Sequence, residues 1–280
     1  MGSAQFCPVG SLEKLLLATD RSEFSEGAVR EAIAFAAKCS STVFVVSVLE
    51  TNPEYETIGS NVFEKEEKEA RAYLDSVKAR AAKENVTCQT VLRGALDPAG
   101  AIVAEATEKK TDMIVVGRRG RKGLLKALMG EVAVKVIAHA PCKVLVVPRA
   151  AKIEWRNLLV ATDGSTHGNA AVAEALAIAK RCGSKVIALS AARDDGELEE
   201  ARSHVGRVVE RGQKEGVSVE ALTPLGRSHD AVVETAGGRG VDLIVMGTYG
   251  KTGVKKLLLG SSTEKVIGSA GCAVLVVKAE

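Results

Sequence analysis

The sequence predicts an α/β fold with two doubly wound, Rossmann-like domains, each built on a five-stranded parallel sheet. Two observations predict this fold. Short continuous apolar runs rich in β-branched residues alternate with longer segments of helical periodicity, and the whole pattern occurs twice along the 280 residues. Strands that alternate with helices indicate right-handed β–α–β units and therefore parallel sheets.

The chain is an internal duplication. "EKLLLATDRS" (13–22) matches "RNLLVATDGS" (156–165), and "TDMIVVGRRG" (111–120) matches "VDLIVMGTYG" (241–250). Because further matches keep the same order, the repeat is a duplicated domain and not a short-period solenoid. We assign residues 1–148 to the first domain, 149–155 to a linker and 156–280 to the second domain. A linker this short favours packing of the two domains against each other.

The continuous apolar runs predict buried parallel strands. In the first copy they are 15–18, 43–48, 86–92, 113–116 and 144–147; in the second they are 158–161, 186–191, 217–222, 243–246 and 274–277. Ala-rich amphipathic segments lie between them, such as "SEGAVREAIAFAAKC" and "GNAAVAEALAIAKRC", and these predict helices.

Composition narrows the class of protein. Only 3% of the residues are aromatic and the net charge is +3, which argues against a nucleic-acid partner. No apolar run reaches membrane-spanning length and the N-terminus lacks the features of a signal peptide, so we expect a cytoplasmic protein without a membrane partner. The six cysteines include no CxxC pair, and four of them repeat between the copies. We therefore expect reduced thiols, no disulfide framework and no cysteine metal site.

A glycine-rich segment after the fourth strand of the second copy is the main candidate site. Its spacing, G-x2-G-x9-G-S, is neither a Walker A motif nor GxGxxG. Glycines let backbone approach a ligand closely, and Ser261 at a predicted helix start suits a phosphate. Asp163, after the first strand, could bind a ribose hydroxyl or help hold a divalent ion. The glycines could instead be only turns and a helix cap.

This pattern, together with "LLVATDGS" and "STEKVIGSAGCAVLVVK", resembles the universal stress protein family over both copies. The resemblance implies an ATP-binding member that acts as a regulator in a stress response, with ATP (or ADP or AMP) as ligand and Mg²⁺ beside Asp163. It also implies pairing through the last strands, 143–147 and 273–277, as an intramolecular pseudo-dimer, with a homodimer as a further option. The implied nucleotide-binding residues are Ala161, Thr162, Asp163, Ala191, Met246, Gly247, Gly250, Gly260, Ser261 and Ser262.

The first copy departs from this pattern at two positions. Glu131 stands where the second copy has Ser261, and Arg21 stands where it has Gly164. A carboxylate at the helix start repels phosphate, so we expect a weak or empty site there. The cations of 118–122 could offset this charge or could simply form a solvated basic loop. The residues that this weaker site retains are Thr19, Asp20, Val48, Gly117, Gly120 and Gly130.

The remaining polar residues favour no efficient enzyme. His167 could touch a phosphate, but a solvent-facing position near a helix start is the simpler interpretation. No catalytic residues are predicted, because no nucleophile elbow and no histidine–carboxylate arrangement occurs. We therefore expect at most weak ATPase or autophosphorylating activity. A nucleotide-free interaction module remains the other alternative, and the sequence does not identify a protein partner.

Overall fold

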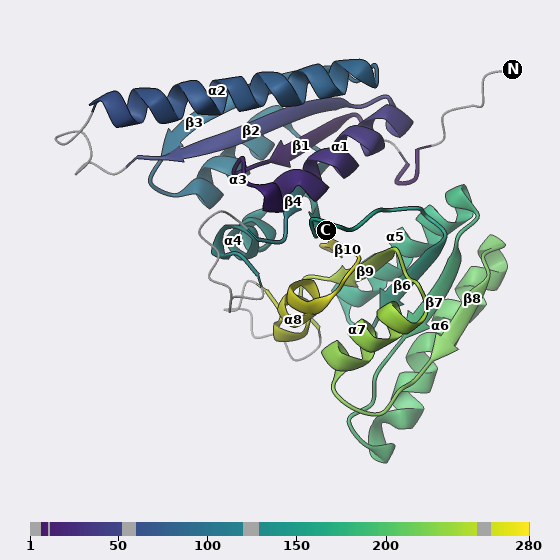
Figure 1. The fold of residues 1–280 in the computed structure, drawn as a ribbon. Helices are drawn as coiled ribbons and strands as arrows, with labels where there is room; N and C mark the ends of the chain where they lie inside the picture. The colour runs from purple at the N-terminus through teal and green to yellow at the C-terminus, as the bar shows by residue number, and fades with distance from the viewer. Residues whose placement is uncertain (1–6, 11, 52–59, 120–128, 251–258, 280) are drawn as a thin grey trace, which may run out of the picture.

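The computed structural model describes residues 7–10, 12–51, 60–119, 129–250 and 259–279 (Figure 1). The first half contains β1 (Lys14–Ala18), the 3-10 turn η1 (Glu23–Ser25), α1 (Glu26–Cys39), β2 (Thr42–Glu50), α2 (Ser60–Lys83), β3 (Cys88–Ala95), α3 (Pro98–Lys109), β4 (Met113–Gly117), α4 (Glu131–His139) and β5 (Lys143–Val147). The second half contains β6 (Asn157–Ala161), α5 (Thr166–Cys182), β7 (Lys185–Leu189), η3 (Asp195–Glu197), α6 (Leu198–Glu215), β8 (Val219–Leu222), α7 (Ser228–Gly238), β9 (Leu243–Gly247), α8 (Ser261–Ser269) and β10 (Ala273–Val277).

All strands belong to one ten-stranded sheet with the order β3-β2-β1-β4-β5-β10-β9-β6-β7-β8. Within each half the five strands are parallel, as predicted. The halves meet where β5 and β10 pair antiparallel, with Leu145 opposite Leu275. In Figure 1 this junction lies between the purple-to-teal half and the green-to-yellow half. The predicted pairing through the last strands is therefore confirmed.

Helices cover both faces of the sheet. Strand residues alternate between two apolar cores, so that Leu15 and Leu17 of β1 pack on one face and Leu16 on the other. The first core contains residues of α1, α2, α5 and α6, and the second contains residues of α3, α4, α7 and α8. Each core is continuous across the junction of the halves. The predicted doubly wound α/β fold, present twice, is confirmed.

The third strand of each half begins two residues later than predicted. Val86 and Val217 are buried, but their N–H groups donate to Ala81 O and Gly212 O in the last turns of α2 and α6, at 2.9 and 2.8 Å. The apolar pattern signals burial correctly, whereas these hydrogen bonds place both valines in the helix ends rather than in the strands.

The connection between the halves is anchored on α1. Trp155 is buried and its ring packs edge-on against Phe35, with ring centroids 5.0 Å apart. Ile153 N–H donates to the Glu31 carboxylate at 3.2 Å, and the Arg30 guanidinium donates to Ala151 O. These contacts hold the linker in the first core, which agrees with the expectation that the halves pack together.

The prediction of uniformly reduced cysteines was wrong for one pair. Cys7 and Cys39 form a disulfide with an S–S distance of 2.06 Å and Cα atoms 4.4 Å apart. Cys7 lies against the last residue of α1. It precedes the repeated part of the sequence, so the periodicity does not predict its position. Cys88, Cys142, Cys182 and Cys272 are free. Among the described residues, no group of three His, Cys, Asp or Glu side chains could hold a metal ion.

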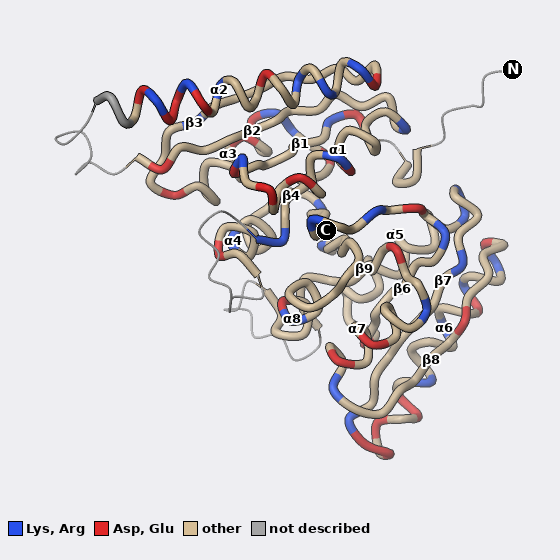
Figure 2. Tube along the Cα trace, in the orientation of Figure 1, with Lys and Arg blue, Asp and Glu red and all other residues tan. Residues whose placement is uncertain are grey.

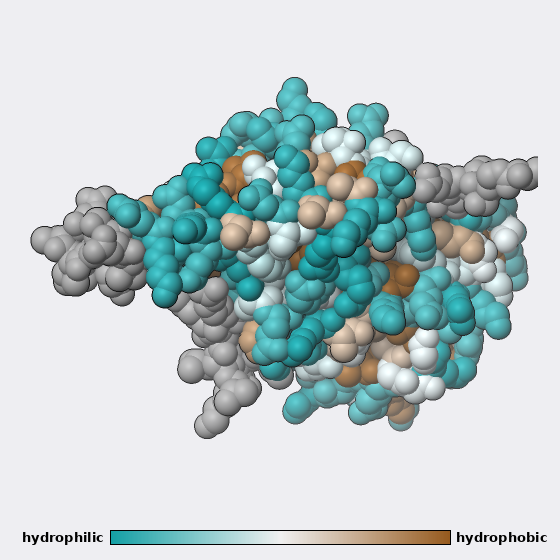
Figure 3. Space-filling model, turned by 45° about the horizontal axis from the view of Figure 1, so that its top comes forward, coloured by the Kyte–Doolittle hydropathy of each residue, from teal (hydrophilic) through white to brown (hydrophobic). Residues whose placement is uncertain are grey.

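The surface is polar and mixed in charge. Along α2, basic and acidic residues alternate (Figure 2), and they include ion pairs one turn apart such as Glu67–Arg71 at 2.6 Å. The face in Figure 3 shows scattered hydrophobic residues among hydrophilic ones. None of the described helices has both the length and the apolar character that crossing a bilayer would require.

Candidate functional site

The residues singled out in the second half lie at the carboxyl ends of three neighbouring strands. Because β6 pairs with both β7 and β9, the segments that follow these strands meet at one edge of the sheet. The helices that follow β6 and β7 cover one face, whereas α7 and α8 cover the other, so the edge between β6 and β9 is a topological switch point. Ligands of doubly wound sheets bind at such a point. The predicted residues here are Ala161, Thr162, Asp163, Ala191, Met246, Gly247, Gly250, Gly260, Ser261 and Ser262.

The turn after β6 is fixed by its own side chains. Thr162 is buried, and its hydroxyl accepts the Gly164 N–H at 3.2 Å. The Asp163 carboxylate accepts the Ser165 N–H at 3.1 Å, and Ser165 Oγ caps α5 by accepting the Gly168 N–H. Gly164 has φ +73°, a conformation that favours glycine. The turn therefore holds the Asp163 carboxylate in a defined place beside the glycine-rich segment.

The glycines of that segment make close contacts within the protein. A Cβ on Gly250 would lie 2.2 Å from the Asp163 carboxylate, and a Cβ on Gly247 would lie 2.8 Å from the His167 backbone. Gly260 packs on Tyr249, and its N–H donates to Thr248 O at 2.8 Å. Close approach is thus the reason for glycine here, but the atoms approached belong to the turn after β6 and the start of α5. The stretch 251–258 lies outside the described residues.

The start of α8 has no side-chain cap from its N-cap residue. Its N-cap is Gly260, which has no side chain, so no side-chain cap satisfies the first N–H groups of the helix. Ser261 is exposed, Ser262 is half-buried, and Thr263 is buried with its hydroxyl donating to Gly247 O at 3.0 Å. The positive end of the helix dipole adds to these donors. The described residues thus bring two serines and an uncapped helix start to the switch point.

His167 has a structural role instead of the solvent-facing position expected from the sequence. Its Nδ1 accepts the Ala279 N–H at 3.0 Å and lies 3.3 Å from Thr248 Oγ1, while its ring packs on Tyr249 with centroids 4.1 Å apart. Burial, reinforced by the positive charge of Lys278, lowers the pKa of His167. The neutral ring therefore ties the C-terminal end of β10 to the glycine-rich segment.

Lys278, one residue before Ala279, forms hydrogen bonds with the first half. Its ammonium donates to Ala138 O and Ala140 O at the end of α4, at 3.0 and 2.7 Å, and desolvation lowers its pKa. Arg118 crosses in the opposite direction and donates to Ala270 O at the end of α8, at 2.7 Å. Each half therefore satisfies a helix C-terminus of the other, which sequence periodicity does not reveal.

The corresponding edge of the first half is built differently. Arg21 takes the place of Gly164 with φ +67°, and its guanidinium donates to the buried Ser47 Oγ at 2.7 Å. Glu131 begins α4 and pairs with Lys135 one turn later at 2.7 Å. Because Arg118 is committed to the second half, it does not face this carboxylate. The retained residues Thr19, Asp20, Val48, Gly117 and Gly130 lie at the strand ends and the helix start, while Gly120 and the cations at 121 and 122 lie outside the described residues.

The fold defines a tandem doubly wound α/β protein whose glycine-rich segment lies at the switch point of the second half. The sequence model of the universal stress protein family matches residues 11–148 and 154–278, and the chain belongs to that family. A universal stress protein of Methanocaldococcus jannaschii, MJ0531, is 36% identical over 149 residues, which are 50% of this chain and 84% of that protein. One from Thermus aquaticus is 36% identical over 139 residues, 44% of this chain and 99% of that protein.

Among solved structures, a universal stress protein from Archaeoglobus fulgidus superposes with a TM-score of 0.75 at 23% identity. The match covers 95% of this chain and 98% of that chain. The fold of nearly the whole chain therefore has a solved counterpart, and at this identity the likeness concerns the fold alone.

Proposed function

We propose that the chain is a regulatory nucleotide-binding protein of the stress response whose site for an adenine nucleotide, ATP in the first instance, lies mainly in the second half. The observation that carries this proposal is the uncapped start of α8, with Ser261 and Ser262, at the switch point beside the Asp163 turn. Helix N-termini with free N–H groups are natural phosphate sites.

In this proposal the phosphates lie against Gly260, Ser261 and Ser262, and the base and ribose lie against the ends of β6 and β7, from Ala161 to Asp163 and at Ala191. Asp163 would give a bound Mg²⁺ one carboxylate oxygen. Since no three candidate ligands converge among the described residues, phosphate oxygens and water would supply the remaining coordination.

The first half supports the assignment to the second half by contrast. Glu131 places a carboxylate at the helix start, where the phosphates of a nucleotide would lie, and Arg21 fills the end of β2 by bonding to Ser47. Both features disfavour the nucleotide that the second half would accept. We therefore expect one strong site in each chain.

The test is calorimetric titration with Mg-ATP. Wild type should bind about one equivalent, and Ser261→Glu, which recreates the Gly-Glu of the first half, should weaken binding about tenfold or more because the carboxylate repels phosphate. The matched control is Gly271→Glu, which adds the same charge past the far end of α8 at a position with no atom within 4 Å. Equal losses in both variants, two equivalent sites in wild type, or no binding at all would contradict the proposal.

A further inference from the structure

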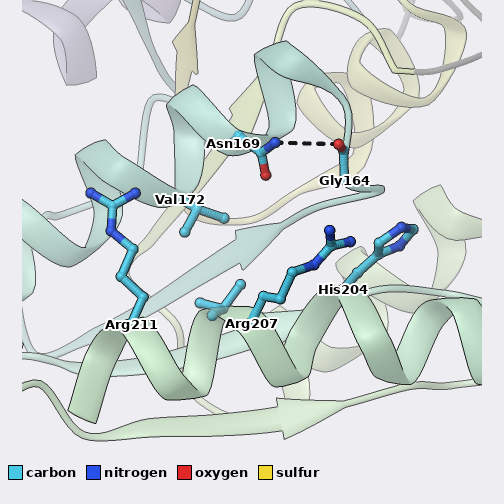
Figure 4. A pocket seen from close by; sticks show the side chains of 7 residues that line it. Gly164, Asn169, Val172, His204, Arg207 and Arg211 are labelled. Atoms are coloured by element: carbon cyan, nitrogen blue, oxygen red, sulfur yellow. Dashed lines mark hydrogen bonds between the residues drawn. The ribbon is translucent and has the colours of Figure 1, made fainter. Parts of the chain in front are cut away.

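A cleft lies in the same half, between α5 and α6 (Figure 4), and it borders the 162–165 turn of the candidate nucleotide site. Its volume is about 110 Å³, and Val172 and Val208 form its apolar floor. Arg207, Arg211 and His204 bring polar side chains to it from α6. A space of this size is smaller than a pocket for a drug-sized ligand, so it suits a small group.

The internal repeat supplies a matched comparison for this cleft. Val29 of α1 corresponds to Val172 of α5 through the matched segments 32–39 and 175–182, and Val77 of α2 corresponds to Val208 of α6 through the equivalent helix ends. The floor is therefore the same in both halves, and any difference arises from the residues around it.

In the first half, side chains occupy the equivalent space and the charges there are paired. Glu26 and Arg80 form an ion pair at 3.0 Å, and the Tyr73 hydroxyl lies 3.4 Å from the same carboxylate. Arg21 reaches in from the loop to Ser47. The one described carboxylate that faces the floor there is thus already matched by a guanidinium.

Four replacements change this balance in the second half, and His204, which replaces Tyr73, is one of them. Asn169 replaces Glu26, which removes the carboxylate, and Gly164 replaces Arg21, which removes the side chain that fills the space. Arg207 replaces Ser76, which adds a guanidinium. The other three replacements open the cleft or make it more positive, whereas the His204 ring takes part of the space beside Gly164, 2.6 Å from a Cβ placed on that glycine.

The charged side chains around the cleft differ in whether they have a partner. Arg211 pairs with Glu215 at 2.8 Å, and His204 lies 3.3 Å from Ser190 Oγ and 3.6 Å from Glu200. Within the described part of the chain, Arg207 makes no hydrogen bond or ion pair.

Arg207 lies beside the loop that follows β6. A Cβ on Gly164 would lie 2.6 Å from the His204 ring and 3.3 Å from a terminal nitrogen of Arg207, so both side chains are close to that glycine, as Figure 4 shows. The Asn169 amide donates to Gly164 O at 3.3 Å, which places an amide beside it.

We propose that this cleft binds a small anion of the phosphate class, either inorganic phosphate or the phosphate group of a phosphomonoester. The planar guanidinium of Arg207 matches the geometry of phosphate oxygens, and Arg211 brings a second guanidinium to the same cleft. The site does not depend on nucleotide binding, because it lies on the α6 side of the 162–165 turn, whereas the Asp163 carboxylate lies against Gly250.

The experiment is a titration of the full-length protein with inorganic phosphate, followed by NMR of the Asn169 side-chain amide and the arginine Nε–H signals, at constant ionic strength. Glycerol phosphate in a parallel titration distinguishes a phosphomonoester from free phosphate as the preferred ligand. Ser261→Glu should weaken phosphate binding at α8 and leave these shifts unchanged.

Arg207→Ser restores the residue of the first half and should weaken phosphate binding by about tenfold. Asn169→Glu restores the carboxylate and should abolish binding. The control is Arg202→Ser on the same helix, where the arginine side chain is 64% exposed and 3.9 Å from Glu199. Equal effects of Arg207→Ser and Arg202→Ser, or identical shifts with chloride alone, would overturn the proposal.

Discussion

Because Gly250 lies close to the Asp163 carboxylate, we expect Gly250→Ala to lower the free energy of unfolding. In Gly250→Ala the new Cβ would lie 2.2 Å from the nearer carboxylate oxygen, and the three nearest atoms all belong to Asp163. An ordinary contact needs roughly 3.5 Å, so the carboxylate must retreat by more than 1 Å. That movement also displaces the other oxygen, Oδ1, and weakens the hydrogen bond that it accepts from the Ser165 N–H.

The expected cost is about 1–2 kcal/mol in the free energy of unfolding. A hydrogen bond to a charged group contributes about 1.5–3 kcal/mol, and water replaces part of it because Asp163 is half-exposed. Gly250 is not among the glycines with positive φ, so alanine causes no backbone strain there. Alanine also lowers the conformational entropy of the unfolded chain, which stabilises the folded state by about 0.4–1 kcal/mol and offsets part of this cost.

A double-mutant cycle measured by chemical denaturation tests this reasoning. In the Asp163→Ala background, Gly250→Ala should be neutral or slightly stabilising, since the carboxylate is gone. Gly271→Ala, at a position with no atom within 4 Å, serves as the control for a glycine replacement without a contact. If Gly250→Ala costs the same in both backgrounds, the glycine is not explained by Asp163, and approach to a ligand becomes the better account.

Three further predictions concern titration and redox. Stability measured against pH should fall as the pH drops below about 6.5, because the folded state holds His167 neutral and the unfolded chain takes up the proton, and His167→Gln should flatten this dependence. Burial raises the pKa of Cys142 and Cys272 to about 11, so mass spectrometry should show much slower alkylation of both at pH 7.5 than after unfolding, and rapid labelling of the native protein would contradict this. Reduction of the Cys7–Cys39 disulfide, which links residues 32 apart, should lower the free energy of unfolding by roughly 3–4 kcal/mol, and an unchanged melting temperature would refute it.

The sequence was sufficient for the fold because the signals that set it are local and repeated. Buried parallel strands are continuous apolar runs, and the duplication shows each run twice, so all strands and the strand-end position of Asp163 and Gly247 could be predicted. Val86 and Val217 show the limit of this approach, since periodicity reports burial and not the hydrogen bond that ends a helix.

Contacts between distant residues could not be predicted from these signals. The bond from Arg21 to Ser47 and the one from Ala279 to His167 depend on where side chains reach after the sheet has formed. The same holds for the disulfide of Cys7, whose segment precedes the repeat. The α5–α6 cleft could have been suspected by aligning the two copies residue by residue along their second helices, where Ser76 changes to Arg207.

The antiparallel pairing of β5 with β10 has a consequence for stoichiometry. A single half would end in a strand whose N–H and C=O groups lack partners, and such an edge readily accepts another strand. In this chain the partner strand is covalently attached, so pairing does not depend on protein concentration. A dimer of two identical domains would also carry two identical helix starts. This chain instead joins one Gly-Ser helix start to one Gly-Glu helix start in every molecule. The difference between the two helix starts is therefore fixed by the covalent chain, and exchange of subunits cannot remove it.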